Sequence, residues 1–442
     1  MSTKIGFISL GCPKNQVDSE LMIAKLAEAG YEMIDTPFGA DVVIINTCGF
    51  IEAAKQEAID NILEMGQYKE DGDVGKILVI GCMAERYRDE ILKEMPEVDA
   101  VAGLGVNGDI VAFVEQALAG ETNSVYPEKT TLPLSGERVL TTPEHWAYLK
   151  ISDGCSNCCA YCAIPQIRGP FRSRPIESIV SEAETLAAQG VKELIVIAQD
   201  TTRYGLDLYG ELKLPALLKE LVKIEGIHWI RLLYCYPDRI TDELLETIRD
   251  NPKILHYIDL PLQHASGKVL KAMHRTGDKE SLLALIRKIR DYLPDAVLRT
   301  TFITGFPGET DEDFDELSEF IDDAAFERLG CFAYSREEGT PAYDFPDQVD
   351  PALAAHRGEV LMDQQYRIFA EKQALLIGRH VECVVEDYDG FSDSYGGRTW
   401  MDAPEIDSSI RFVSDRDLNV GDFVTVRIND TDEYDLIGEV VD

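Results

Sequence analysis

The segment Ile151-Ser-Asp-Gly-Cys155-Ser-Asn-Cys158-Cys159-Ala-Tyr161-Cys162-Ala-Ile-Pro165 contains the cysteines that decide the fold. Cys155, Cys159 and Cys162 stand in Cys-x3-Cys-x2-Cys order, directly after an apolar stretch at residues 146–152 that is predicted to be a strand. Three thiolates can each bind one iron of a cubane cluster, and the fourth iron then has no protein ligand. The spacing therefore predicts a 4Fe-4S cluster with one open iron.

Two other interpretations of these cysteines are a zinc knuckle and a set of packed apolar side chains. Zinc usually takes four Cys or His ligands, and free cysteines are often buried as small apolar residues. Cys158 is the nearby candidate for a fourth zinc ligand, but it is adjacent to Cys159 and should point elsewhere in a tight loop. We therefore favour the cluster.

The cysteine segment opens a run of alternating strand and helix patterns. Predicted strands lie at residues 146–152, 194–198, 230–234, 256–260, 297–303 and 330–334, with helical patterns such as 177–188 and 279–292 between them. Six such units predict an α/β fold with a partial (β/α)6 barrel, because the complete form has eight. Directly after the first strand, the cysteines would lie at the carboxyl-terminal mouth, where barrel active sites are built.

The cysteine spacing on a six-unit barrel resembles the radical SAM superfamily. This resemblance implies that the open iron binds S-adenosylmethionine (SAM) and passes one electron to its sulfonium. The segment from Thr304 to Glu309 follows the fifth strand and is similar to the superfamily's glycine-rich adenosyl-binding segment. We expect Gly305, Gly308 and Glu309 to contact SAM, although a tight turn between strand and helix also explains the glycines.

Further candidates for SAM contacts are polar residues near the predicted strand ends, namely Gln199, Gln263 and Arg299. Arg299 could pair with the carboxylate of SAM. A structural role is the alternative for each of them. The family's barrel-mouth loop is also matched by residues 167–174, whose arginines could hold SAM or a substrate carboxylate, or could be solvated.

A second group of cysteines lies in the first part of the chain. Strands are predicted at residues 5–10, 42–46, 77–80 and 98–103, and helices at 19–29 and 51–65, so a parallel sheet is expected. Cys12, Cys48 and Cys82 each come just beyond a predicted strand. Ligands of open α/β sheets bind at that edge, so we expect the three to converge and bind a second 4Fe-4S cluster. The alternative is three unrelated buried cysteines.

The chain divides into three predicted domains. An N-terminal α/β domain at residues 1–120 is followed by a linker at 121–140 that is rich in Thr, Pro, Glu and Ser. The barrel spans 141–377 and ends in a long helical pattern at 353–376, before Gly378. Residues 378–442 alternate in period two between Gly and Asp breaks, which predicts a small antiparallel β-barrel with strands at 381–386, 399–401, 423–428 and 433–440.

The charge of the chain is strongly acidic, with a formal net charge of −38. Nucleic-acid binding requires basic groups that neutralise phosphates, so no large nucleic-acid footprint is expected. A basic protein partner suits this field better, although a generally acidic host proteome also explains it. No apolar stretch is long enough to span a membrane, and we expect a soluble, cytoplasmic protein.

Two cysteine triads and a small C-terminal barrel together resemble the methylthiotransferase family, and the resemblance covers essentially the whole chain. It implies an N-terminal methylthiotransferase domain, a radical SAM barrel and a TRAM domain. The family replaces a C–H bond with C–SCH3, using two 4Fe-4S clusters and two SAM. One SAM supplies the methyl group and the other supplies the 5′-deoxyadenosyl radical that abstracts hydrogen. An electron donor and a sulfur donor are therefore implied as partners.

Family members modify either tRNA adenosines or the β-carbon of one aspartate in small-subunit ribosomal protein S12. The segment 10–20, LGCPKNQVDSE, is similar to the ribosomal-protein (RimO-type) branch, as is the segment from Arg398 to Asp407. Residues 380–442 hold 17 acidic and 4 basic side chains, which would repel tRNA and attract a basic ribosomal protein. The alternatives are a tRNA methylthiotransferase and a non-catalytic iron–sulfur module that binds the ribosome.

Overall fold

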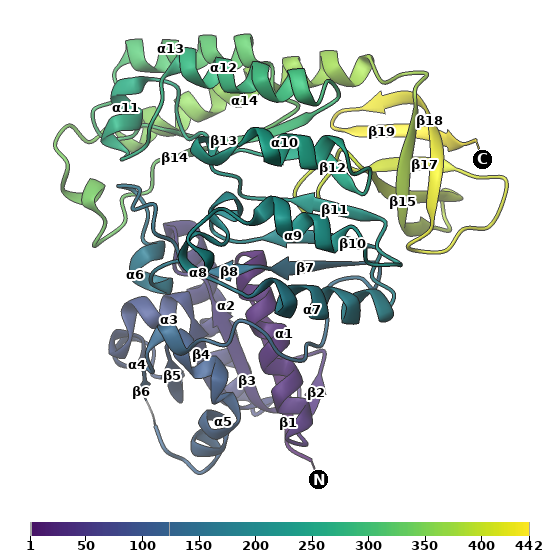
Figure 1. The fold of residues 1–442 in the computed structure, drawn as a ribbon. Helices are drawn as coiled ribbons and strands as arrows, with labels where there is room; N and C mark the ends of the chain where they lie inside the picture. Colours follow the sequence, from purple (N-terminus) through teal and green to yellow (C-terminus); the bar gives the residue numbers. More distant parts are fainter. Residues whose placement is uncertain (1, 123, 442) are drawn as a thin grey trace.

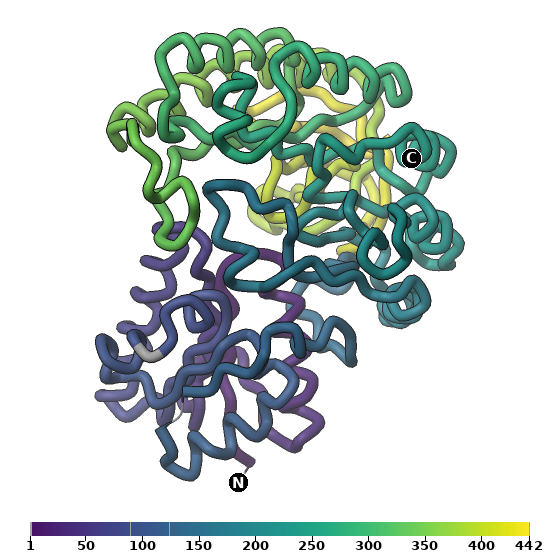
Figure 2. Tube along the Cα trace, turned by 60° about the vertical axis from the view of Figure 1, so that its left-hand side comes forward, coloured from purple at the N-terminus to yellow at the C-terminus, as the bar shows by residue number. Residues whose placement is uncertain are grey.

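The computed structural model describes residues 2–122 and 124–441. Figure 1 shows an N-terminal α/β domain, a central curved sheet flanked by helices, and a small barrel at the C-terminus. The tube in Figure 2 shows the first domain below the open central sheet. Among the described residues, no helix is both long and apolar enough to cross a membrane.

The N-terminal domain is a six-stranded parallel sheet in the order β2-β1-β3-β4-β5-β6, covered by helices. Its central strands are almost continuously apolar, as expected for strands that are buried on both faces. The elements are β1 (Lys4–Ser9), α1 (Pro13–Glu28), β2 (Glu32–Ile34), β3 (Ala40–Thr47), α2 (Glu52–Asp71), β4 (Val74–Gly81), α3 (Cys82–Tyr87), α4 (Asp89–Glu94), β5 (Ala100–Ala102), α5 (Ile110–Leu118) and β6 (Ser124–Val125).

The central domain confirms the six-unit partial barrel, with parallel strands in the order β7-β10-β11-β12-β13-β14. Its elements are β7 (Trp146–Lys150), β8 (Ser152–Asp153), α6 (Ile164–Arg168), β9 (Arg172–Ser173), α7 (Ile176–Ala188), β10 (Glu193–Ile197), α8 (Leu206–Tyr209), α9 (Leu214–Leu221), β11 (Trp229–Leu232), α10 (Asp242–Arg249), β12 (Ile254–Asp259), α11 (Gly267–Ala272), α12 (Lys279–Tyr292), β13 (Val297–Thr304), α13 (Asp311–Ala324), β14 (Arg328–Ala333) and α14 (Pro351–Ala374).

The C-terminal domain is a closed five-stranded barrel in the order β15-β16-β17-β19-β18. Its strands are β15 (His380–Asp389), β16 (Ser394–Thr399), β17 (Ile410–Val413), β18 (Phe423–Asp432) and β19 (Asp435–Val440). The predicted barrel is confirmed, but it is not wholly antiparallel, because β17 and β19 close it as a parallel pair.

Two local predictions from the sequence were wrong. The predicted linker contributes β6, which extends the first sheet beside β5. The expected strand at 399–401 is mostly a turn, because β16 lies earlier and contains Gly396 and Gly397. A β-carbon at Gly397 would lie 2.3 Å from the Val384 carbonyl oxygen, so these glycines serve close strand packing rather than a turn.

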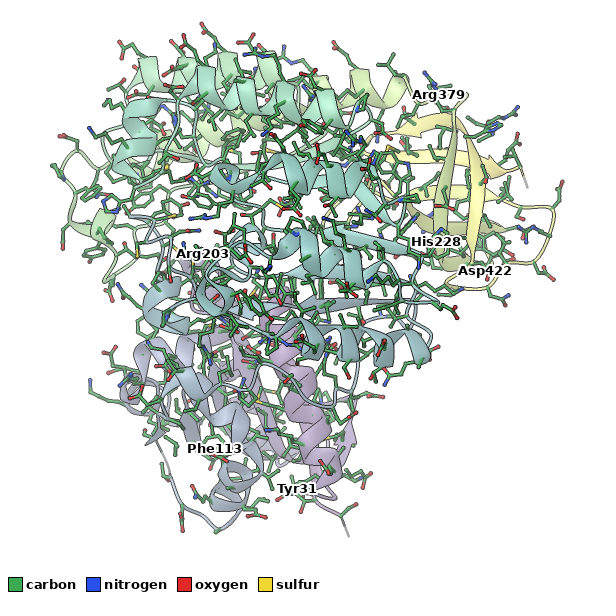
Figure 3. The ribbon with its side chains drawn as sticks, in the orientation of Figure 1. Tyr31, Phe113, Arg203, His228, Arg379 and Asp422 are labelled. Carbon is green, nitrogen blue, oxygen red and sulfur yellow. The ribbon has the colours of Figure 1, made fainter. Side chains whose placement is uncertain are left out.

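The two faces of the central sheet are buried against different partners. Its outer face packs on the barrel helices, with Leu298 and Phe302 as examples. On its inner face, aromatic side chains such as Trp146, Trp229 and Tyr257 pack against the C-terminal barrel. Figure 3 labels His228 at this junction, where its Nε2 lies 3.0 Å from Glu382 Oε1. The C-terminal barrel is therefore fixed against the open side of the sheet.

Candidate functional site

The first-domain cysteines lie at one edge of the sheet. Cys12 precedes α1, Cys48 follows β3 and Cys82 begins α3, and the strands before them, β1, β3 and β4, are neighbours. A β-carbon on Gly11 would lie 3.1 Å from the Cys48 sulfur, so this glycine lets the two cysteine loops approach each other. The three thiols are close enough to interact electrostatically.

Two cations from different domains surround this first triad. Burial raises the pKa of the Cys12 thiol. The ammonium group of Lys14 and the guanidinium of Arg168 oppose this effect, and the resulting pKa lies below its ordinary value. Burial raises the pKa of Cys82 to about 12, and Arg168 opposes that increase. The site therefore favours thiolates most strongly at Cys12.

The barrel cysteines occupy the loop after β8. Cys159 is buried, Cys155 and Cys162 are half-buried, and Cys158 is exposed. Cys158 has a left-handed backbone with φ of 54°, and this conformation turns it out of the buried side of the loop. Arg275 Nη1 lies 3.8 Å from the Cys159 sulfur, and its Nη2 donates to the Pro261 carbonyl oxygen at 2.8 Å. Sequence reasoning missed this cation, because nothing in its local sequence marks it.

Both triads have donor sets that fit iron–sulfur clusters. Each set is three thiols, and no three Cys, His, Asp or Glu side chains in the described part of the chain are grouped as ligands of a single metal ion. A cubane differs from a single ion because each of its thiolates binds a different iron. Burial raises the pKa of Cys155 to about 11, so a bound metal is needed to keep this thiol ionised.

The two cysteine sites meet at the boundary between the domains. Cys82 packs with Ala163 and Ile167, which directly follow the barrel cysteines. A cavity of about 560 Å³ is lined by Phe50, two residues after Cys48, and by Tyr161, which lies inside the barrel cysteine loop. Ligand pockets commonly have this volume. The cavity therefore borders both cysteine loops.

Among the expected SAM contacts, Gln263 lines this cavity together with Thr301 and Ile303 of β13. It has a left-handed backbone with φ of 74° and is bonded through its main chain to β13 on both sides. Gln199 follows β10, and neither its amide nitrogen nor its amide oxygen has a hydrogen-bond partner among the described residues, although both atoms are buried. Unpaired buried polar atoms of this kind fit a ligand that supplies the missing bonds.

The glycine-rich segment is held by its own internal contacts. Glu309 Oε2 accepts from the Gly305 main chain at 2.8 Å, and Oε1 accepts from Arg357 at 2.7 Å. Gly305 has a φ of 72°, and a β-carbon there would lie 2.2 Å from the Ala354 side chain. Gly308 has a φ of 84° and open space beside it. Glu309 therefore stabilises the loop through its internal contacts, and the space beside Gly308 is free for a ligand.

Arg299 lies away from the expected position. It is the third residue of β13 rather than its end, and it donates to Asp259 at 3.0 Å and lies 3.5 Å from Asp407 of the C-terminal barrel. The strand begins at Val297, as predicted, so position 299 lies near its amino-terminal end, away from the carboxyl-terminal mouth. The structure thus places Arg299 beside the C-terminal barrel instead of at the mouth.

Arg168 connects the two domains through a buried ion network. Its guanidinium donates to Asp18 at 3.0 Å and Asp153 at 2.8 Å, and Lys150 bonds the same two carboxylates. It also donates to Asn15 at 3.2 Å. The network contains two cations and two anions, and all four side chains are almost fully buried.

The segment from Arg398 to Asp407 is acidic, which suggests a surface position, but two of its charged residues are buried against the central sheet. Arg398 donates to Glu193 of β10 at 2.7 Å, and Arg328 of β14 donates to Asp402. Both segment residues are almost fully buried. This segment therefore docks the C-terminal barrel onto the sheet. Apart from Glu405, the exposed acidic groups of that barrel lie outside the segment, as at Asp387, Asp393, Asp415, Asp417, Asp430, Asp432 and Glu433.

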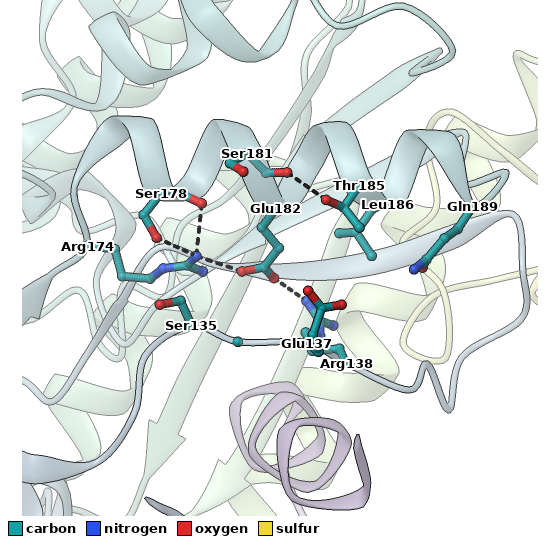
Figure 4. Close-up of a pocket in the computed structure, with 11 residues that line it drawn as sticks. Ser135, Glu137, Arg138, Arg174, Ser178, Ser181, Glu182, Thr185, Leu186 and Gln189 are labelled. Atoms are coloured by element: carbon teal, nitrogen blue, oxygen red, sulfur yellow. Dashed lines mark hydrogen bonds and ion pairs between the residues drawn. The ribbon is translucent and has the colours of Figure 1, made fainter. Parts of the chain in front are cut away.

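Another pocket, of about 220 Å³, lies between α7 and the segment before the barrel (Figure 4). Three of its charged side chains are paired with each other: Glu182 accepts from Arg138 at 2.5 Å and from Arg174 at 2.6 Å. Arg138 also pairs with Glu20 of α1 at 2.6 Å. This cluster is another joint between the domains.

Comparison with protein families agrees with this architecture. An uncharacterized protein family, UPF0004, matches residues 4–103, the radical SAM superfamily matches 149–321, and the TRAM domain matches 377–441. Among solved structures, the radical S-adenosylmethionine methyltransferase TsrM from Kitasatospora setae aligns over 77% of each chain, with a TM-score of 0.58 and 15% identity. That likeness concerns the fold alone. The fold and the cysteine loop define a radical SAM protein.

Relatives named ribosomal protein uS12 methylthiotransferase RimO match nearly the whole chain. The protein from Desulforamulus reducens is 49% identical over 439 residues, which are 99% of each chain. The one from Geobacter sulfurreducens is 44% identical over 447 residues, covering 99% of this chain and 98% of the relative. The chain belongs to the RimO family of methylthiotransferases.

Proposed function

We propose that this protein replaces a C–H bond with C–SCH3 on the β-carbon of an aspartate in small-subunit ribosomal protein uS12. The observation that carries the proposal is the cavity bordered by both cysteine loops, in a chain about half identical to RimO relatives. We assign Cys12, Cys48 and Cys82 to one 4Fe-4S cluster and Cys155, Cys159 and Cys162 to the other. When bound, the clusters and SAM supply the radical and the methylthio group.

The residues of this chain prepare the site for that chemistry. Arg168 and Lys150 neutralise the carboxylates where the domains meet, and so fix the two cysteine loops relative to each other. Gln199 and Gln263 are candidates for polar contacts with SAM, and Gly308 lets its backbone approach the ligand. The C-terminal barrel closes the inner face of the sheet against water.

The partners follow from the same proposal. The protein works in the cytoplasm on a basic ribosomal protein, which its net charge of −38 attracts. It also needs an electron donor and a sulfur donor. A tRNA substrate is not favoured, because the relatives that match almost the whole chain are named for a ribosomal protein.

The decisive experiment is mass spectrometry of ribosomal protein uS12 and of tRNA from a host with and without this protein. We expect uS12 to lose about 46 Da, the mass added when SCH3 replaces H, when the protein is absent. Complementation with Cys155→Ala should not restore that mass, whereas Cys158→Ala should. Loss of a methylthio group from tRNA, with uS12 unchanged, would overturn the proposal.

A further inference from the structure

Lys14 is a buried lysine beside the first cysteine triad. It lies two residues after Cys12 in the first turn of α1, and only 6% of its surface is exposed. Among the residues that the structure describes, no hydrogen bond or ion pair reaches its ammonium group, whose contact is the ring of Tyr234, with Nζ 3.2 Å from the ring centroid. The Cys12 thiol acts on Lys14 electrostatically, but buried polar groups normally also have hydrogen-bond partners, so this arrangement is incomplete by itself.

The two carboxylates that act electrostatically on Lys14, Asp259 and Asp153, already have other partners. Asp259 accepts from Arg299 at 3.0 Å and from the Tyr234 main chain at 2.8 Å. Asp153 accepts from Arg168 at 2.8 Å and from the Gly154 main chain at 2.7 Å. Rearrangement of Lys14 toward either group would therefore compete with cations that are already in place.

The position of Lys14 is set by both domains. Tyr234 follows β11 of the barrel and has a left-handed backbone with φ of 61°, a conformation that is costly for a tyrosine. Its main chain is bonded to Asp259 and Thr201, which fix the ring beneath the ammonium group. Lys14 therefore projects from the cysteine edge of the first domain onto the inner side of the barrel.

We propose that Lys14 binds the carboxylate of the substrate aspartate. This inference rests on the proposed function. The β-carbon of aspartate is bonded directly to the side-chain carboxylate. A cation that binds this carboxylate therefore also positions the reacting carbon between the two cysteine sites. An ammonium–carboxylate hydrogen bond is charge-assisted and strong in a buried site. The same chemistry is present in the carboxylate of SAM, and the experiment separates the two sources.

The test uses the reconstituted protein, purified ribosomal protein uS12, and a form of uS12 with asparagine at the target aspartate. Lys14→Met keeps the length of the side chain and removes a buried unpaired charge, so the variant should fold. Lys14→Arg retains a cation as the conservative variant. Lys93→Met is the matched control, because Lys93 is in the same domain but its side chain is 79% exposed.

We expect Lys14→Met to bind uS12 about 10- to 100-fold more weakly, from the loss of one charge-assisted hydrogen bond. Wild-type protein should prefer the aspartate form over the asparagine form by a similar factor, and Lys14→Met should bind both forms alike. Lys14→Arg should recover part of the preference, and Lys93→Met should match wild type. Iron content and SAM cleavage without uS12 are measured for each variant, because they report the two cysteine sites separately from uS12 binding.

Three results would overturn the proposal. Unchanged uS12 binding in Lys14→Met would show that the Tyr234 ring alone satisfies the ammonium group. Loss of SAM cleavage without uS12 would assign Lys14 to the carboxylate of SAM, and loss of half the iron would assign it to the first cluster. Failure of the proposed function would be distinct, because wild-type protein would then leave uS12 unmodified.

Discussion

Replacing Arg168 with methionine should lower the free energy of unfolding by about 3–5 kcal/mol, the usual cost of removing one partner from a buried ion pair. The guanidinium donates to Asp18, Asp153 and Asn15 at distances between 2.8 and 3.2 Å. With Lys150 the network has two positive and two negative charges, all buried. Without Arg168, two carboxylates share one lysine, and a net charge of about −1 stays inside the protein.

Urea unfolding followed by circular dichroism measures this loss. Arg249→Met is the control, because Arg249 is exposed and pairs with its neighbour Asp250, and such surface pairs contribute about 0–1 kcal/mol. Adding Asp18→Asn to Arg168→Met restores the charge balance, with one lysine facing one aspartate. The double variant should therefore lose less than the sum of the two single losses, by about 0.5–3 kcal/mol.

Two results would refute this reasoning. If the free energy of unfolding of Arg168→Met lay within about 1 kcal/mol of the wild-type value, the buried network would add no net stability. Strict additivity of Arg168→Met and Asp18→Asn would mean that the two side chains are not coupled.

Three other changes test other parts of the structure. Cys159→Ala should lose about half of the iron in a reconstituted sample, since three thiolates are needed for each cluster, while Cys158→Ala should retain all of it; equal loss in both would contradict the ligand assignment. Glu193→Gln removes the carboxylate that pairs with two buried arginines, Arg231 and Arg398, so the C-terminal barrel should become sensitive to limited proteolysis, and wild-type resistance would argue against this joint. Burial raises the pKa of the Asp313 carboxyl, but hydrogen bonds from Lys268, Thr310 and Ser266 hold it well below its usual range. Because this pKa is depressed in the folded state, the stability it confers is present above about pH 4 and lost as the pH falls below that value. Asp313→Asn should flatten the acid limb of a stability–pH curve, and an unchanged limb would rule out this contribution.

Much of the fold follows from local sequence patterns. The long helix expected at 353–376 is α14, Pro351–Ala374. It could be predicted because its capping residues and its apolar periodicity are local features of the sequence. β2 was missed because its three residues, one exposed and two half-buried, carry too little apolar pattern to mark a strand. In the sequence, the two glycines of β16 suggested a break between strands. In the structure they let β15 pack closely against β16, and this role cannot be seen in a linear pattern.

The sequence by itself determined the two cysteine triads and the order of the elements around them. Spacing within one loop and position after a strand are local properties, and adjacent parallel strands bring their ends together. Tertiary structure alone decided which charged groups are paired. Arg299 pairs with Asp407 and Arg398 with Glu193, across more than a hundred residues of chain. Among the described residues, Lys14 forms no ion pair with a carboxylate, because Asp153 and Asp259 are already paired with arginines of the central domain. Such long-range pairing depends on distances that exist only in the folded protein.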